Sequence, residues 1–415
     1  MSISQYRMYP QDIIDAILDQ LHGDPTTLKQ CALAATAFGQ TSQKHLFRTI
    51  HLVEFVKAQA HCERLHQTLT ESPHLSSFIR ELYVKDSPAS SSSINGFEMV
   101  DATNWMARDA NFVALLPMLP NLRYLAISSF YGLDWKELPE AVRGAVLNAL
   151  KSIPVLKLSN VMNFPVSQFQ NFVGLRKLTF DSVKFDTEAQ NLAVTVPHRG
   201  HLDSLYFTQE SQASVRSLIE QLELPTSSLT ISQLRQLEVA GSSPDMLVTV
   251  SSLLEASSCT LKTLIWQMNA VNSSPLAPAL DSFDLGMASE LHRLSLIVVV
   301  KGSPAENAQL QWVARNFASA ERGIATNLAK LDLRLTLMVA DPFGAPVEDI
   351  SDHAIWADLD AALAAPRYSN LSRVCFYVSV YGWRKDDTSR RGQLSSQLVQ
   401  KMPLLSNKGA LSLFV

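Results

Sequence analysis

The sequence has few of the features that mark secreted, membrane-spanning or disulfide-linked proteins. Its 415 residues include only four cysteines, Cys31, Cys62, Cys259 and Cys375, with no CxxC pair and no framework spacing. Scattered cysteines are typical of reduced, buried thiols, and they predict a cytoplasmic or nuclear protein. The first ten residues lack the apolar core of a secretory signal. The apolar run from Leu294 to Val300 is far shorter than the roughly 20 residues of a membrane span.

Charge of one sign is also lacking. The chain has 35 Lys and Arg residues against 39 Asp and Glu residues, a formal net charge of −4. This balance gives no reason to expect nucleic acid or an anionic membrane as a partner. Charged residues make up only 18% of the chain and hydrophobic residues 47%, which predicts a folded protein rather than a disordered one.

The sequence contains none of the common motifs of catalysis or metal binding. GxSxG, P-loop, HExxH, GxGxxG and CxxC patterns do not occur. His61, Cys62 and His66 come nearest to a metal cluster, but on one helix at most two of them converge, so a polar surface helix is favoured. We expect no catalytic, metal or cofactor residue and no enzyme activity, although a site assembled from distant residues would leave no motif.

The first fifty residues show helical periodicity. Pro10 suits the first turn of a helix, and Gly23 suits its end. Five aliphatic residues between them fall within an arc of about 140°: Ile13, Ile14, Ile17, Leu18 and Leu21. A stripe of this width can pack against more than one neighbour.

Two further short helices follow. Asp24 is expected as the N-cap and Pro25 as the first residue of the second helix. Its apolar face is formed by Leu28, Cys31, Ala32, Ala35 and Phe38. Leu33 points nearly the opposite way, and a third helix is expected to be N-capped by Thr41 or Ser42. Spacing alone leaves open whether the surplus apolar surface packs against the rest of the chain or binds a partner.

In order along the chain, these residues fall in register with a known domain. The matching positions are Pro10, Ile13, Ile17, Leu18, Leu21, Asp24, Pro25, Leu28, Cys31, Leu33 and His45 to Arg48. Residues 8–50 thereby resemble an F-box, in the F-box-like variant abundant in mushroom-forming fungi. The departures from that variant are Tyr9, Asp12, Gly23, Ala32 and Phe38, of which Gly23 and Ala32 change the character of the position.

The resemblance implies a partner and a function. An F-box docks on the Skp-type adaptor of an SCF-type cullin-RING ubiquitin ligase, so the chain would be the substrate receptor that holds a protein target for ubiquitination. The implied adaptor contacts are Tyr9, Pro10, Ile13, Ile14, Leu18, Leu28, Cys31 and Leu33. The alternative is an interaction scaffold in which residues 1–50 only cap the rest of the chain.

The remaining chain repeats one template: apolar, two residues, Leu, one residue, apolar. Its ten copies begin at Ile79, Leu122, Ile153, Leu175, Leu202, Leu234, Leu261, Leu291, Leu328 and Leu371, and an eleventh is suggested at Ala410-Leu413-Val415. Helices are expected between the copies, over 141–150, 215–222, 246–254, 355–363 and 394–402, and from a capping box at 303–306 through Phe317.

This alternation predicts an α/β fold, with an irregular leucine-rich-repeat horseshoe of parallel strands inside and helices outside. A doubly wound α/β fold is the competitor. We expect three parts: the F-box-like domain (8–50), a linking helix (51–75) and the solenoid (76–415). The solenoid region looks like the irregular leucine-rich repeats that follow this type of F-box in the same fungal proteins.

Residues between and beside the template leucines should face out along the inner sheet. Exposed Tyr and Arg often anchor interfaces, and the residues expected to bind a target there are Tyr124, Lys177, Tyr206, Arg293, Arg334, Arg373 and Tyr377. Two insertions interrupt the repeat pattern: a Ser-rich stretch at 87–93 and a mixed-charge loop at 383–391.

Overall fold

The computed structural model describes most of the chain. The described residues are 10–53, 57–86, 105–187, 200–224, 227–268, 280, 283–301, 308–318, 327–338, 354–380, 383 and 387–415. The chain divides into two compact units. Unit 1 comprises residues 1–168, 172–175 and 183–189, and unit 2 comprises 169–171, 176–182 and 190–415. Within the described residues, no helix combines the length and apolar character that crossing a membrane requires.

Unit 1 begins with three helices, α1 (Gln11–Gln20), α2 (Pro25–Ala34) and α3 (Thr36–Leu46). The predicted cap of α2 is confirmed: Asp24 Oδ1 accepts hydrogen bonds from the amides of Thr26 and Thr27 at 3.1 and 3.0 Å. The predicted start of α3 is wrong. Ala35 is extended (φ −156°, ψ 146°), so α2 ends there and α3 begins at Thr36, which places Phe38 on α3.

The two residues expected to cap the third helix lie inside it instead. Thr41 and Ser42 are both buried in α3. The hydroxyl of Thr41 donates a hydrogen bond to Asp15 of α1, which ties the two helices together. His45 of α3 and Asp19 of α1 add a second contact at 2.7 Å.

The core of these three helices is small. Ile14, Leu18 and Leu28 are buried within it. Several half-buried residues surround them, namely Leu21, Cys31, Ala37, Phe38 and Leu46. The other half of the aliphatic stripe faces solvent, because Ile13 is 45% exposed and Ile17 is 59% exposed. Sequence spacing thus correctly predicted a stripe wider than one small neighbour covers.

Four parallel strands form the ladder of unit 1, in the order β1 (Thr49–Leu52), β2 (Glu81–Asp86), β3 (Tyr124–Asp134) and β4 (Val155–Met162). The helices between them are α4 (Ala58–Glu71), α5 (Trp105–Arg108), α6 (Ala110–Leu115) and α7 (Glu140–Leu150). Leu82 lies opposite Leu125, and Leu125 opposite Leu156, so successive template copies are in register.

Strand β1 corrects the predicted end of the first domain. Ile50 pairs with Leu82, and Leu52 with Val84. Phe47, Ile50 and Leu52 therefore form a further copy of the template, part of which lies within the segment that resembles an F-box. The copy was overlooked because its central residue is Ile rather than Leu.

Unit 2 continues the same construction with eight parallel strands. They are β6 (Lys177–Asp181), β9 (Ser204–Thr208), β11 (Gln236–Ala240), β12 (Thr263–Met268), β13 (Arg293–Lys301), β14 (Lys330–Met338), β15 (Arg373–Val380) and β16 (Leu411–Phe414). Its helices are α8 (Gln212–Leu222), α9 (Pro244–Ala256), α11 (Ala308–Ala318), α13 (Ile355–Ala364), α14 (Thr388–Lys401) and α15 (Pro403–Asn407).

The template is buried throughout its ten predicted copies. Its central residues, from Leu178 to Val374, stand opposite one another in the ladder of unit 2. The suggested eleventh copy is out of register by two residues, because Val374 pairs with Leu411 and Phe376 with Leu413.

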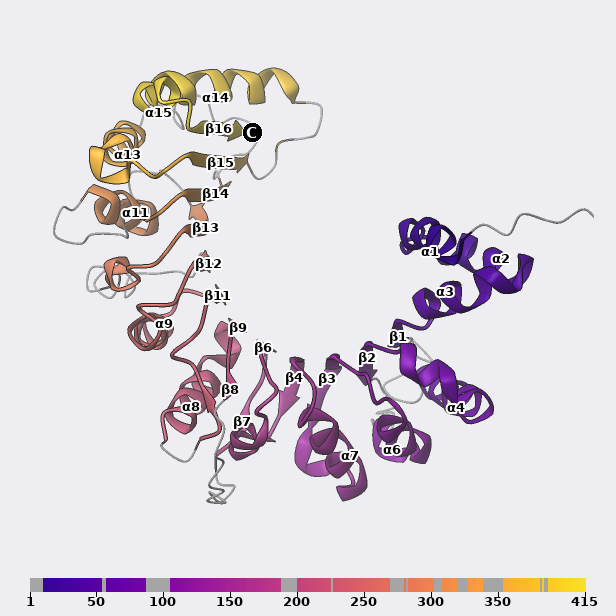
Figure 1. The fold of residues 1–415 in the computed structure, drawn as a ribbon. Helices are drawn as coiled ribbons and strands as arrows, with labels where there is room; N and C mark the ends of the chain where they lie inside the picture. Colours follow the sequence, from indigo (N-terminus) through magenta and orange to yellow (C-terminus); the bar gives the residue numbers. More distant parts are fainter. Residues whose placement is uncertain are drawn as a thin grey trace, which may run out of the picture. The chain divides into compact units, whose positions relative to one another are not determined.

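Each unit has the strand-plus-helix arrangement of leucine-rich repeats. Strand order follows chain order in both ladders, whereas a doubly wound sheet reverses direction. In Figure 1, α4, α6 and α7 lie on one side of the strands of unit 1, and α8, α9, α11 and α13 lie on one side of the strands of unit 2. A doubly wound fold would place helices on both sides. The leucine-rich-repeat prediction is therefore supported over the doubly wound alternative.

Most predicted helices were found within a few residues of their expected bounds. The expected mixed-charge loop is partly helical, since α14 already begins at Thr388. The linking helix is α4, which runs to Glu71. The Ser-rich stretch at 87–93, the capping box at 303–306 and Tyr9 lie outside the described residues.

Candidate protein-binding surfaces

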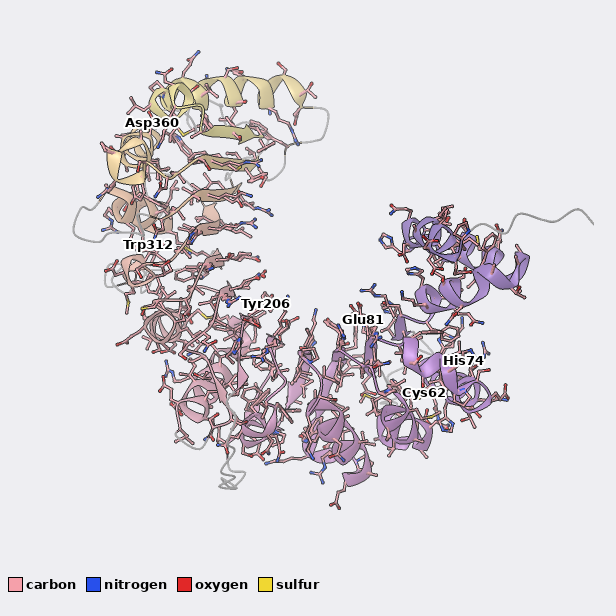
Figure 2. The ribbon with its side chains drawn as sticks, viewed as in Figure 1. Cys62, His74, Glu81, Tyr206, Trp312 and Asp360 are labelled. Carbon is pink, nitrogen blue, oxygen red and sulfur yellow. The ribbon has the colours of Figure 1, made fainter. Side chains whose placement is uncertain are left out.

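The face of each ladder that points away from the helices is called the open face here. Figure 2 shows Glu81 and Tyr206 on this side of the strands, with Cys62 and Trp312 toward the helices. Because strand residues alternate between faces, all seven predicted target-binding residues belong to the open face. Tyr124 lies in unit 1, and the others lie in unit 2, which are Lys177, Tyr206, Arg293, Arg334, Arg373 and Tyr377.

In unit 1 the open face carries a stack of rings. His51 stacks on Tyr83 with centroids 4.6 Å apart, and Tyr83 lies 4.8 Å from Tyr124. Burial raises the pKa of Tyr124 to about 12, and burial together with Glu81 raises the pKa of Tyr83. Both phenols are therefore neutral at physiological pH, and the hydroxyl of Tyr83 donates to Glu81 Oε2 at 3.4 Å.

Beside this stack, unit 1 has a groove with a volume of about 920 Å³. Its lining includes Lys44, Arg48, Arg80 and Arg123 against the carboxylates of Asp19 and Glu81. The three arginines each stand two residues before the central residue of a template copy. The main chain fixes this column, because the carbonyls of Arg48 and Arg80 each accept two amides from the next repeat, and the carbonyl of Arg123 accepts the amide of Val155.

The groove was not predicted, but the sequence contains its signal. An arginine stands two residues before each of Ile50, Leu82 and Leu125 in the sequence. Most of the predicted target-binding residues stand directly beside a template leucine, whereas these arginines stand two residues before it, so the column was not predicted.

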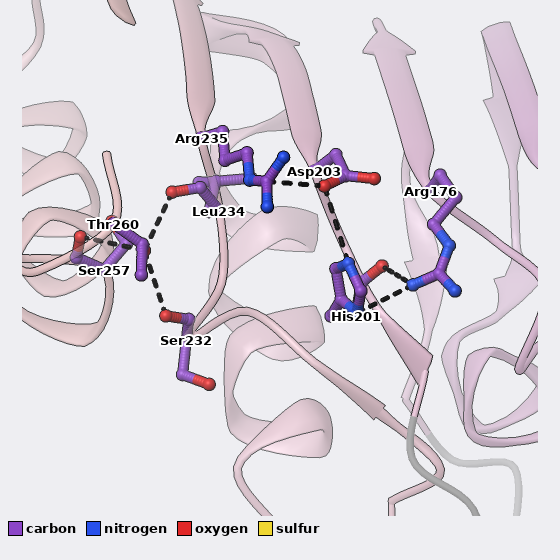
Figure 3. A network of polar contacts seen from close by, with 8 residues as sticks. All are labelled: Arg176, His201, Asp203, Ser232, Leu234, Arg235, Ser257 and Thr260. Atoms are coloured by element: carbon purple, nitrogen blue, oxygen red, sulfur yellow. Dashed lines mark hydrogen bonds and ion pairs between the residues drawn. The ribbon is translucent and has the colours of Figure 1, made fainter. Parts of the chain in front are cut away.

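The first three residues of the same column in unit 2, Arg176, Asp203 and Arg235, alternate in charge. Figure 3 shows Arg176 reaching the ring of His201 at 2.8 Å and its carbonyl at 3.0 Å. Asp203 lies 3.5 Å from His201 and 3.9 Å from Arg235. The hydroxyl of Thr260 anchors the adjacent turn: it lies 3.0, 3.0 and 3.2 Å from the carbonyl oxygens of Ser232, Leu234 and Ser257, which share its one proton. These charges satisfy one another, which suits a role in holding successive repeats together.

The last strands of unit 2 carry a different arrangement, which we call the cationic patch: Arg293, Lys330, Asp332, Arg334, Arg373, Tyr377 and Phe414. Arg293 and Lys330 both approach Oδ2 of Asp332, at 3.0 and 3.4 Å. The Asp332 side chain is only 3% exposed beneath them. It lies in the ladder opposite Ser295 on one side and Cys375 on the other.

The other members of the cationic patch are held by sulfur and aromatic contacts. Arg373 Nε donates to Cys375 Sγ at 3.2 Å. The guanidinium of Arg334 lies over the Tyr377 ring, 5.0 Å from its centroid. Tyr377 in turn stacks on Phe414 with centroids 4.7 Å apart and planes at 10°. Four of the seven predicted target-binding residues therefore lie together in this patch.

The predicted adaptor-binding residues separate into two groups. Pro10, Ile13 and Leu33 are exposed, Leu33 at 89%, and Cys31 is half-buried. Ile14, Leu18 and Leu28 are buried among the three helices. We therefore correct their assignment: these three residues form the core and offer no surface to a partner.

His61, Cys62 and His66 are the nearest approach to a metal cluster in the sequence. The described residues contain no group of three His, Cys, Asp or Glu side chains able to hold a metal ion. Cys62 is fully buried, and burial raises the pKa of its thiol, with neighbouring Asp109 acting in the same direction. Cys62 therefore behaves as a small core residue.

Comparisons with known proteins add little to these observations. The sequence matches no protein-family model and no curated protein. Among solved structures, the fold is similar to the crystal structure of an internalin (inlF) from Listeria monocytogenes str. 4b F2365. The identity is 12%, the match covers 85% of this chain and 93% of that one, and the TM-score is 0.29. At that score the similarity carries no weight, and the leucine-rich-repeat assignment relies on register and burial.

Proposed function

We propose that this protein is the substrate-receptor subunit of an SCF-type cullin-RING ubiquitin ligase. In this role the three helices dock on the Skp-type adaptor, and the open face of the repeats holds a protein target. The receptor acts by proximity, because it raises the effective concentration of target lysines near the ubiquitin-carrying enzyme.

The exposed aliphatic face of α1 carries the proposal. Ile13 and Ile17 are one helical turn apart and so lie on the same face. Both remain in solvent although the helix buries Ile14 and Leu18. The segment that exposes them also resembles an F-box, whose known function is to dock helices on an adaptor.

Co-purification with a Skp-type adaptor tests the proposal. The Ile13→Asp/Ile17→Asp double variant should lose at least tenfold in retention, because each buried aliphatic anchor contributes roughly 1.5–3 kcal/mol. The control is Val248→Asp/Val399→Asp, which changes two exposed valines on α9 and α14 of unit 2. Equal retention of wild type and the Ile13/Ile17 variant would refute docking through α1.

The scaffold alternative keeps one observation in its favour. Helix α3 contacts the 3-10 segment Pro73–Phe78, close to the first repeats. Removal of residues 1–46, which leaves β1 intact, distinguishes the ligase proposal from the scaffold alternative. The ligase proposal predicts stable repeats that no longer retain the adaptor, whereas a cap predicts aggregation or a large drop in melting temperature.

A further inference from the structure

The cationic patch concentrates positive charge in a chain that is negative overall. Four cations, Arg293, Lys330, Arg334 and Arg373, face the single carboxylate of Asp332, while the whole chain carries −4. Among the described residues, Arg334 and Arg373 form no ion pair with a carboxylate. The patch therefore holds an excess of positive charge on the open face.

These cations are already held in place. Asp332 fixes Arg293 and Lys330, Cys375 accepts from Arg373, and Tyr377 lies beneath Arg334. Side chains that are ordered before binding lose less conformational entropy when a partner arrives. Such preorganisation favours binding to the patch over a purely solvated role for these residues.

The spacing of the cations indicates the kind of anion. Lys330 pairs in register with both Arg293 and Arg373, and neighbouring strands are about 4.8 Å apart. The charge is thus distributed along a row with Lys330 at its middle, and Asp332 lies beside the row, two residues further along β14. A row of single positive charges matches several carboxylates along an extended chain, whereas the carboxylate of Asp332 repels one concentrated dianion.

An aromatic surface adjoins the row. Phe414 is 47% exposed and stacks on Tyr377. An exposed ring supported by a second ring offers an apolar contact beside the charges, and Arg, Tyr and Phe together are frequent at the centre of interfaces.

We propose that the cationic patch binds an extended acidic segment of a protein, with Asp or Glu side chains opposite Lys330, Arg334 and Arg373 and an apolar side chain against Phe414. The inference deepens the proposed function, because the segment would belong to the ligase target. The test of this inference uses the full chain without the adaptor, so the peptide-binding proposal and the ligase proposal can fail separately.

Fluorescence anisotropy measures the binding. The probe is a labelled twelve-residue peptide of alternating Glu and Ser with one central Leu, and its matched peptide has Gln in place of Glu. We expect the Glu peptide to bind and the Gln peptide not to. Binding should weaken at least tenfold when the salt concentration is raised from 50 to 300 mM, because exposed charges are screened.

Variants localise the site. Arg334→Gln/Arg373→Gln should weaken the Glu peptide at least tenfold and leave adaptor retention unchanged. Arg334→Lys/Arg373→Lys keeps the charge and should retain most binding, which excludes misfolding as the cause. The control Arg216→Gln/Arg390→Gln removes the same charge from α8 and α14 and should bind as wild type does.

Three results would overturn the proposal. The Gln peptide could bind as well as the Glu peptide, or the Arg334→Gln/Arg373→Gln variant could bind as wild type does. The third result is binding only by a peptide with one phosphoserine among Gln residues, which would assign the patch to a dianion.

Discussion

The three N-terminal helices and the repeats use their aliphatic residues differently. In the repeats every apolar position of the ten template copies is buried, and the central leucines stack in register from strand to strand. In the helices, Ile14, Leu18 and Leu28 are buried while Ile13, Ile17 and Leu33 face solvent. The difference is that the repeats bury the apolar positions of their template, whereas the three helices keep part of their aliphatic surface exposed.

The largest expected effect concerns the core of the repeats. Leu264 is fully buried between Leu237 and Leu294 of the neighbouring strands. Leu264→Ala should lower the free energy of unfolding by about 2–5 kcal/mol, because it leaves a cavity in a packed core. Urea denaturation measures the change. The adjacent open-face variant Ile265→Ala should have a much smaller effect, and similar losses would mean that the two faces are equally packed.

A smaller effect should distinguish neighbouring residues of α1. Leu18→Ala removes a residue that is 2% exposed, whereas Ile17→Ala removes one that is 59% exposed. We expect a loss of about 2 kcal/mol for Leu18→Ala and less than about 0.5 kcal/mol for Ile17→Ala. Hydrogen exchange of the amides in α1 to α3 reports local stability. A larger loss of stability for Ile17→Ala than for Leu18→Ala would mean that Ile17, and not Leu18, lies in the core of the three helices.

The smallest effects are pH dependences of opposite sign in the two regions. The side chain of Thr27 and the backbone amides of α2 lower the pKa of Asp24, so its stabilisation is present at neutral pH and is lost as pH falls through the folded-state pKa. Burial raises the pKa of Glu238 in the repeats, so its ionised form destabilises the fold at neutral pH.

Thermal melting at several pH values measures both effects. Asp24→Ala should lower the melting temperature at pH 7, and Glu238→Gln should raise it. The Glu238 difference should disappear below the ordinary carboxyl pKa of about 4. The Asp24 difference should disappear only below the lowered folded-state pKa of Asp24, where this group too is protonated in the folded and unfolded states. Changes of the same sign at pH 7 would contradict this account.

Much of the fold could be predicted because leucine-rich repeats have a local code. The template predicted which face of each strand is buried, and Asp24-Pro25 predicted the start of α2. The start of α3 could not be predicted in the same way, because only the extended conformation of Ala35 separates it from α2. No cap residue marks that break.

The candidate site was only partly predictable. Strand alternation placed Arg293, Arg334, Arg373 and Tyr377 on the open face. The contacts that unite them depend on Asp332, Cys375 and Phe414, which come from three different repeats. Such contacts are set by register between strands, and the register at β16 differed from the expected one by two residues.

Hydrogen exchange of the full-length protein, with and without a Skp-type adaptor, tests the central claim most directly. The account predicts that the adaptor slows exchange in α1 and α2, and leaves the open face of the repeats unchanged. It also predicts that Ile13→Asp/Ile17→Asp abolishes this protection while the folded exchange pattern remains. Unchanged exchange in α1 and α2 at saturating adaptor, or protection confined to the repeats, would contradict it.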